Sequence, residues 1–118
     1  MASKQFTLQL DTAAYKGTVS VNTGLFIGGK WVDPADGGTI DVINPATGKL
    51  ITTVSAGTDK DVDVAVDIAK KAFKDSWGLK VPGTERAKLL NKLADLVEAN
   101  LEELAALESL DTGELSRV

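Results

Sequence analysis

The 118-residue sequence contains no cysteine and no histidine. A disulfide framework and thiolate metal sites are therefore excluded for these residues. The absence of histidine also argues against zinc and most transition-metal sites, which draw on imidazole or thiolate ligands. Covalent catalysis by a thiol is excluded as well, because the nucleophile in such reactions is a cysteine thiolate.

Positive charge and long apolar runs are scarce too. The chain has 13 Lys and Arg against 17 Asp and Glu, a net charge of -4 with no basic stripe, so no nucleic-acid partner is expected. No run of about 18 apolar residues is present, and no membrane partner is expected. Residues 1–10 lack the apolar stretch of a secretory signal and residues 1–24 contain no arginine, which predicts a cytoplasmic protein.

What remains is the composition of one small globular domain, with 43% hydrophobic and 25% charged residues. Residues 1–24 are polar and rich in threonine and serine. Within them, residues 5–10 and 18–21 alternate polar and apolar side chains, as strands do. Because chain termini fray unless they dock, we expect residues 1–24 to form a loosely attached N-terminal arm.

Short strands and tight turns are predicted next. Four strand-like runs are present, at residues 25–27, 30–32, 39–43 and 50–54. Gly28 and Gly29 separate the first two runs, which predicts a hairpin with a primed turn. Residues 44–48 combine Asn, Pro and Gly in the order that turns favour. This half of the chain is therefore predicted to be a β-meander with a hairpin.

After Gly57 the apolar period changes from two to about 3.6 residues, which predicts helices. Thr58 is expected to cap the first helix, with Asp61 in the capping-box position. Its apolar face holds Val62, Ala65, Val66, Ala69, Ala72 and Phe73.

Thr84 is expected to cap a second helix with a broad apolar stripe, which favours burial on more than one side. Asn100 is expected to cap a short third helix, with Glu103 at the matching capping-box position. Gly113 is expected to end that helix.

A family resemblance rests on an ordered set of segments, at residues 25–32, 42–48, 61–66, 72–73, 77, 85–86, 89–90, 92–98 and 107–113. Together they resemble the N-terminal stretch of the NAD(P)-dependent aldehyde dehydrogenase superfamily over residues 25–113. Residues 1–24 resemble the variable leader of fungal cytosolic members. The resemblance implies an α/β fold: a partial aldehyde dehydrogenase fold in which the β-meander precedes three helices of the cofactor-binding domain.

Residues 114–118 depart from the family pattern, in which a Lys and a Pro usually follow before several hundred further residues. We therefore expect an N-terminal fragment of a longer enzyme. The resemblance implies that the full-length parent oxidises an aldehyde to a carboxylic acid with NAD or NADP. In that reaction a Cys attacks the carbonyl and a Glu activates water. Both residues lie downstream in the family.

The isolated chain is therefore expected to bind no cofactor and to be catalytically inactive, and the parent is expected to form a homo-oligomer. A second hypothesis is an interaction module that docks onto full-length aldehyde dehydrogenase subunits. A third is a stand-alone α/β domain whose similarity is accidental. Since Trp31, Phe73 and Trp77 would pack against segments that this chain lacks, we expect a large exposed apolar patch.

One site carries over in part from the resemblance. Many family members hold a monovalent cation, and the matching positions here are the main-chain carbonyls of Val42 and Ile43 and the side chain of Asp111. The alternative is that Asp111 caps or hydrogen-bonds a nearby turn.

Other clusters of candidate residues favour plain structural roles. Counted from Asp59, a calcium loop would need Gly at position 64 and Glu at position 70, where Val and Lys stand. Gly28 and Gly29 lack the third glycine and the following helix of a phosphate loop. Three glutamates on the third helix are expected to form a solvated face rather than a catalytic pair: Glu102, Glu103 and Glu108.

Overall fold

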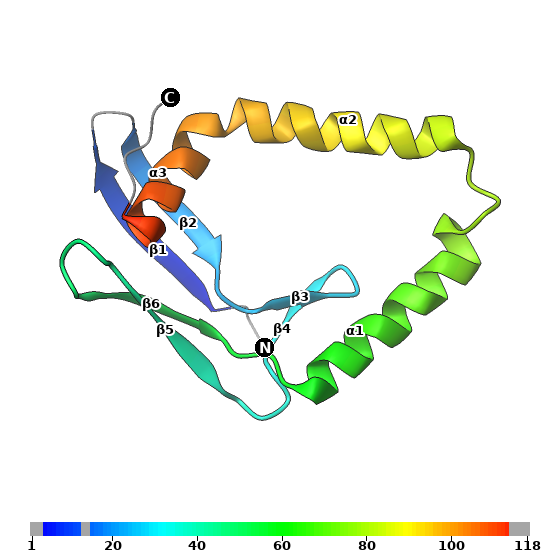
Figure 1. Ribbon diagram of the computed structural model, residues 1–118, viewed down its shortest axis with the longest axis horizontal. Coiled ribbons are helices and arrows are strands. Elements are labelled where there is room, and N and C mark those ends of the chain that lie inside the picture. The colour runs from blue at the N-terminus through cyan, green and yellow to red at the C-terminus, as the bar shows by residue number, and fades with distance from the viewer. Residues whose placement is uncertain (1–3, 13–14, 114–118) are drawn as a thin grey trace.

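The computed structural model describes residues 4–12 and 15–113. It confirms the expected α/β class, with antiparallel strand pairs followed by helices (Figure 1). The strands are β1 (Gln5–Asp11), β2 (Lys16–Asn22), β3 (Leu25–Ile27), β4 (Lys30–Val32), β5 (Thr39–Ile43) and β6 (Leu50–Ser55). The helices are α1 (Asp59–Ala72), a π-helical extension η1 (Phe73–Trp77), α2 (Gly83–Ala99) and α3 (Leu101–Thr112).

The strands of the described residues pair as separate two-stranded hairpins, β1–β2, β3–β4 and β5–β6, and not as one meander sheet. The short β3–β4 hairpin has the expected turn, since Gly28 and Gly29 have φ angles of 61° and 76°. A backbone hydrogen bond joins the β1–β2 and β5–β6 hairpins, since the Ser55 N–H donates to the Thr23 carbonyl at 2.8 Å. The Thr23 N–H donates to the Lys4 carbonyl at 3.0 Å and so continues the pairing of β1 with β2.

The most buried side chains lie where the β1–β2 hairpin meets α3. Val19 has no exposed surface, and Leu10 and Ala106 are also buried. Leu107 and Leu110 of α3 pack against this cluster. The expectation of a loosely attached arm is therefore wrong for residues 4–12 and 15–24. Their alternating pattern gives the hairpin one apolar face, and α3 covers that face.

The helix boundaries follow the local signals with two exceptions. Thr58 and Asp61 form the predicted capping box of α1, and Gly113 ends α3 with a φ of 74°. Helix α2 begins at Gly83 with Pro82 at its N-cap, so the prediction of Thr84 as the cap is wrong. Asn100 lies at the N-cap position of α3, but its side chain makes no cap hydrogen bond there. Its amide donates instead to the Leu96 carbonyl of α2 at 2.7 Å, so the prediction of an Asn100 cap with Glu103 in a capping box is wrong.

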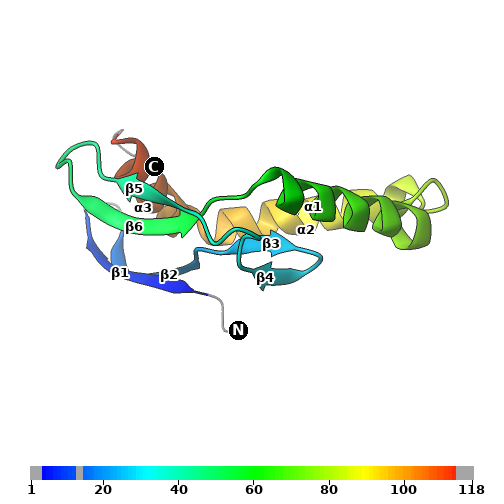
Figure 2. The ribbon, with the colours of Figure 1, turned by 90° about the horizontal axis from the view of Figure 1, so that it is seen from below.

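The elements enclose an open ring, in which α2 spans the side opposite the hairpins (Figures 1 and 2). The principal extents are 48 × 37 × 23 Å. Among the described residues α2 contributes no buried side chain, so the expectation that its stripe is buried on more than one side is wrong within this chain. Residues 4–12 and 15–113 include no helix that is both long and apolar enough to cross a membrane.

Candidate functional site

The residues proposed for a cation site lie where β5 and β6 face the last turn of α3. Val42 and Asp111 line one pocket of about 370 Å³, together with apolar side chains from β2, β6 and α3. The end of α3 also lies close to the Asn-Pro turn. If Gly113 carried a Cβ, that atom would be only 2.8 Å from Pro45 Cγ. The fold therefore brings two predicted residues, 69 positions apart in the printed sequence, to one pocket.

Ile43 stands at the rim of this arrangement. It follows Val42 at the end of β5 and is exposed, and it does not line the pocket. The pairing of β5 with β6 shifts register between Val42 and Ile43. The extra residue of this irregularity is Ile51 of β6, because Val42 pairs with Thr52 and Ile43 pairs with Leu50.

The donor set of this pocket is small. Within the described residues, no group of three His, Cys, Asp or Glu side chains could hold a metal ion. Asp111 supplies carboxylate oxygens, and most of the other lining side chains are apolar. A hard cation prefers about six or more oxygens, and the side chains of this pocket supply only the Asp111 carboxylate and the Thr52 hydroxyl.

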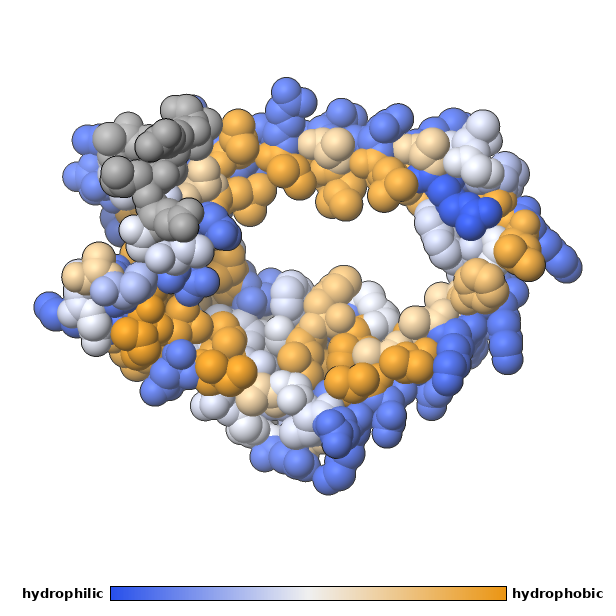
Figure 3. Space-filling view, in the orientation of Figure 1, coloured by the Kyte–Doolittle hydropathy of each residue, from blue (hydrophilic) through white to orange (hydrophobic). Residues whose placement is uncertain are grey.

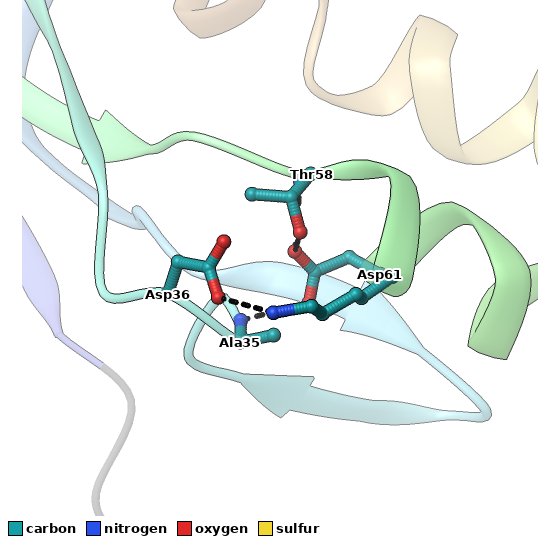
Figure 4. Close-up of polar contacts among 5 residues, drawn as sticks. Ala35, Asp36, Thr58 and Asp61 are labelled. Carbon is teal, nitrogen blue, oxygen red and sulfur yellow. Dashed lines mark hydrogen bonds and ion pairs between the residues drawn. The ribbon is translucent and has the colours of Figure 1, made fainter.

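A second polar cluster surrounds Asp61 at the start of α1 (Figure 4). The Asp61 carboxylate accepts hydrogen bonds from the Thr58 N–H at 2.8 Å and from the Thr58 hydroxyl at 2.9 Å. Its other oxygen accepts from the Ala35 N–H at 2.9 Å. These donors, the Thr58 N–H first, lower the pKa of Asp61 because they favour the charged carboxylate.

This cluster is a clamp between the loop after β4 and the N-terminus of α1. Asp61 is only 8% exposed, and three donors already occupy its oxygens. Lys60 adds an exposed ion pair to Asp36 at 3.0 Å across the same junction. Asp61 therefore positions the helix, which agrees with the rejection of a calcium loop. The sequence predicts its bonds to Thr58, but the Ala35 partner lies 26 residues away and carries no local signal.

The glutamates of α3 differ in exposure. Glu102 and Glu108 are exposed and Glu103 is half-buried. Glu102 and Glu103 line an open pocket of about 340 Å³ with Tyr15 and the end of α2. The expected solvated face is therefore confirmed for Glu102 and Glu108.

Aromatic side chains are exposed as the sequence leads us to expect. The Phe26 and Trp31 rings pack across the β3–β4 hairpin in a tilted arrangement, with centroids 5.1 Å apart, and both are exposed. Phe73 and Trp77 are exposed as well. Apolar side chains border the opening of the ring, on the sides of α1 and α2 that face it (Figure 3).

Comparison with known proteins places this arrangement in context. Residues 31–117 match the model of the aldehyde dehydrogenase family. An aldehyde dehydrogenase of Agaricus bisporus is 54% identical over 108 residues, which cover 92% of this chain and 22% of that protein. The chain therefore spans about a fifth of the length of the curated relatives it matches.

Solved structures give the same result. A putative aldehyde dehydrogenase from Burkholderia cenocepacia superposes with a TM-score of 0.74 at 55% identity, over 78% of this chain and 18% of that one. A betaine aldehyde dehydrogenase from Staphylococcus aureus, in complex with NAD+, superposes with a TM-score of 0.75 at 36% identity, over 79% of this chain and 18% of that one.

Proposed function

Because this chain belongs to the aldehyde dehydrogenase family, we propose that it is the N-terminal segment of an NAD(P)-dependent aldehyde dehydrogenase. The whole subunit would oxidise an aldehyde to a carboxylic acid, as a homo-oligomer in the cytoplasm. The observation that carries the proposal is the family match over residues 31–117. The superposition on an NAD+ complex supports a nicotinamide cofactor for the whole enzyme.

The 118 residues alone are proposed to have no turnover and to bind no cofactor. They contain no cysteine, and the thioester chemistry that the family resemblance implies needs a thiolate. Their Asp61 carboxylate is held by three donors, so it offers no free general base.

A chimera tests this function directly. The 118-residue chain replaces the matching segment of the Agaricus bisporus relative in one continuous polypeptide, and NADH or NADPH formation is followed with several aldehydes. We expect an active chimera, and no rate above the blank for the 118-residue chain by itself. A folded but inactive chimera would contradict the segment role, and turnover by the short chain would contradict its inactivity.

Val42, Ile43 and Asp111 are proposed to supply part of a monovalent cation site. The shared pocket of Val42 and Asp111 and the place of Ile43 directly after Val42 at the end of β5 support it. The test replaces choline by potassium or sodium at constant ionic strength and compares thermal midpoints of the wild type and Asp111→Asn. Asp95→Asn, on the exposed α2, is the matched control. Equal cation responses in all three proteins would count against the site.

A second candidate function is an interaction module that docks onto aldehyde dehydrogenase subunits. The exposed apolar side chains of α1 and α2 favour it, because soluble monomers keep contiguous apolar patches small. Co-purification of the tagged chain with the intact Agaricus bisporus relative tests it. If only the tagged chain is recovered, the docking function fails.

A further inference from the structure

The loop between β4 and β5 contains a pair of residues that is prone to spontaneous rearrangement. Asp36 and Gly37 form the only Asp-Gly pair of the printed sequence, which contains no Asn-Gly pair. Glycine carries no Cβ, so no side chain of its own shields its backbone nitrogen. The short side chain of an aspartate can reach the nitrogen of the next residue and close a cyclic imide with it. The pair is therefore a candidate site of covalent modification.

The structure leaves this pair open to solvent. The Asp36 side chain is 54% exposed (Figure 4), and Gly37 is exposed as well. Gly37 has a φ of 70°. Its chain neighbours left aside, no heavy atom of the described residues lies within 4 Å of the place that a Cβ would take. Both the ring closure and the later entry of water therefore have room.

Two contacts nevertheless hold the reacting groups apart in the folded chain. The Gly37 N–H donates to the Pro34 carbonyl at 3.0 Å and so closes a tight turn. The Asp36 carboxylate is paired with the Lys60 ammonium at 3.0 Å. While these contacts last, the nitrogen is engaged with another oxygen and the carboxyl group is held on a side chain of α1.

The Asp61 clamp fixes this turn on the start of α1. Ala35 lies inside the turn, and its N–H donates to the Asp61 carboxylate at 2.9 Å. Lys60, which holds the Asp36 carboxylate, is the residue before Asp61 on the same helix. Opening of the clamp would therefore release the turn from α1 and free both reacting groups.

We propose that Asp36–Gly37 is a site of spontaneous aspartate isomerisation and that the Asp61 clamp sets its rate. The Gly37 nitrogen attacks the side-chain carboxyl carbon of Asp36. A C–N bond forms, and the carboxyl O–H leaves with the amide proton as water. Water then adds to the cyclic imide. Breaking the new C–N bond restores aspartate, whereas breaking the original peptide C–N bond gives isoaspartate. The step needs no oxidant or cofactor, and it is independent of the proposed function.

Isoaspartate would change the junction between the strands and α1. It carries the backbone through the former side chain and so adds a methylene to the loop. The Pro34 turn and the bond from the Ala56 N–H to the Gly38 carbonyl, 2.9 Å long, flank the altered residue. A longer backbone cannot keep both in their present geometry, so the modified chain loses part of its attachment to α1.

Incubation at neutral pH followed by peptide mapping tests the site. Electron-transfer fragmentation distinguishes isoaspartate from aspartate at each position. We expect isoaspartate at position 36 before any other aspartate of the folded chain. Asp36→Glu keeps the charge facing Lys60 but lengthens the side chain, so it should form no isomer there. The chain unfolded in guanidinium gives the unrestrained rate. Isoaspartate in guanidinium, but not in the folded wild type or in a clamp variant, would overturn the proposal.

A matched pair of variants tests the control by the clamp. Asp61→Ala removes the acceptor of the Ala35 N–H and should raise the initial rate at position 36 by about 10-fold. Asp63→Ala removes an exposed carboxylate from the same helix and should leave the rate unchanged. Equal rates in the wild type and both variants would overturn the role of the clamp.

Circular dichroism establishes that the helices of Asp61→Ala remain formed, because an unfolded variant would react faster for a trivial reason. Lys60→Ala provides a second route, since it frees the Asp36 carboxylate and leaves the Ala35 bond in place. It should raise the rate by about 2- to 5-fold, the range expected of an exposed ion pair. No increase in Lys60→Ala would show that this pair does not restrain the reaction.

Discussion

Two parts of the molecule differ in what covers their apolar side chains. The base is formed by β1, β2 and α3. The second part, called the arm from here on, is the helical side formed by α1 and α2 and is not the N-terminal segment. In the base, Val19 is fully buried and Leu10 and Ala106 are nearly so. In the arm, apolar residues with equal hydrophobicity are half exposed, such as Val66 at 42% and Leu93 at 57%. Helix α1 approaches the β3–β4 hairpin at Gly28, beside which Ile68 of α1 lies.

The difference shows that amphipathic pattern and burial are separate properties. An alternating or helical pattern provides an apolar face, but a face is buried only if the chain also supplies the surface that covers it. Helix α3 covers the β1–β2 hairpin. The ring contains no element that covers α2 among the residues described, and α2 consequently has no buried side chain.

The largest expected effect is a change in the base. Val19→Ala should lower the free energy of unfolding by roughly 2 to 3 kcal/mol, because it removes buried methyl groups and leaves a cavity. Val66→Ala makes the same chemical change in the arm and should cost less than about 0.5 kcal/mol. Urea unfolding followed by circular dichroism measures both. Equal costs would erase the distinction between base and arm.

A glycine pair tests the contact between α3 and the Asn-Pro turn. Gly113→Ala and Gly48→Ala both place a side chain at positive φ, 74° and 67°, at a cost of about 1 kcal/mol each. Only at Gly113 would the added Cβ also meet Pro45, 2.8 Å from its Cγ, so this substitution should cost about 1 kcal/mol more. Thermal unfolding of the two variants checks the order. A smaller loss for Gly113→Ala would show that the contact is absent.

The pH dependence of stability should report on the Asp61 clamp. Its pKa is lowered in the folded chain, so its contribution is present above about pH 4, the ordinary range of an Asp. The contribution is lost as the pH falls through the lowered folded pKa. Asp61→Asn should therefore show a flatter decline of the thermal midpoint below about pH 4 than the wild type. Parallel curves would exclude a role for the Asp61 charge.

The smallest effect is expected at the exposed ion pair beside the clamp. Lys60 and Asp36 are 3.0 Å apart with both side chains largely exposed, and such pairs contribute at most about 1 kcal/mol. Lys60→Ala should change the free energy of unfolding by about 0.5 kcal/mol or less, and high salt should reduce even that difference. A larger, salt-independent loss in urea unfolding would mean that Lys60 has a structural role beyond this pair.

Local signals made much of the fold predictable. The capping box of Thr58 and Asp61 involves residues three positions apart. The primed turn needs only Gly28 and Gly29, and the end of α3 needs only Gly113. The prediction that Thr84 caps α2 is wrong because Pro82 is also favourable near the start of a helix. The N–H that proline lacks has no partner within the helix at that position, so its absence costs nothing.

Contacts between distant segments were not predictable in this way. The docking of the β1–β2 hairpin depends on Ala106, 87 positions after Val19 in the printed sequence. The Ala35 bond to Asp61 likewise depends on how a loop folds back. Val42 and Asp111 could be grouped only through the family resemblance, and the exposed state of α2 could not be read from a stripe that is typical of buried helices.

Hydrogen exchange of the backbone amides tests the contrast between base and arm most directly. Amides in packed elements open only with much of the molecule, whereas amides in uncovered elements open locally at low free energy. We predict slow exchange in β1, β2 and α3 of the free chain and faster exchange in α2. Exchange in α2 of the free chain as slow as in β1 and β2 would contradict the account.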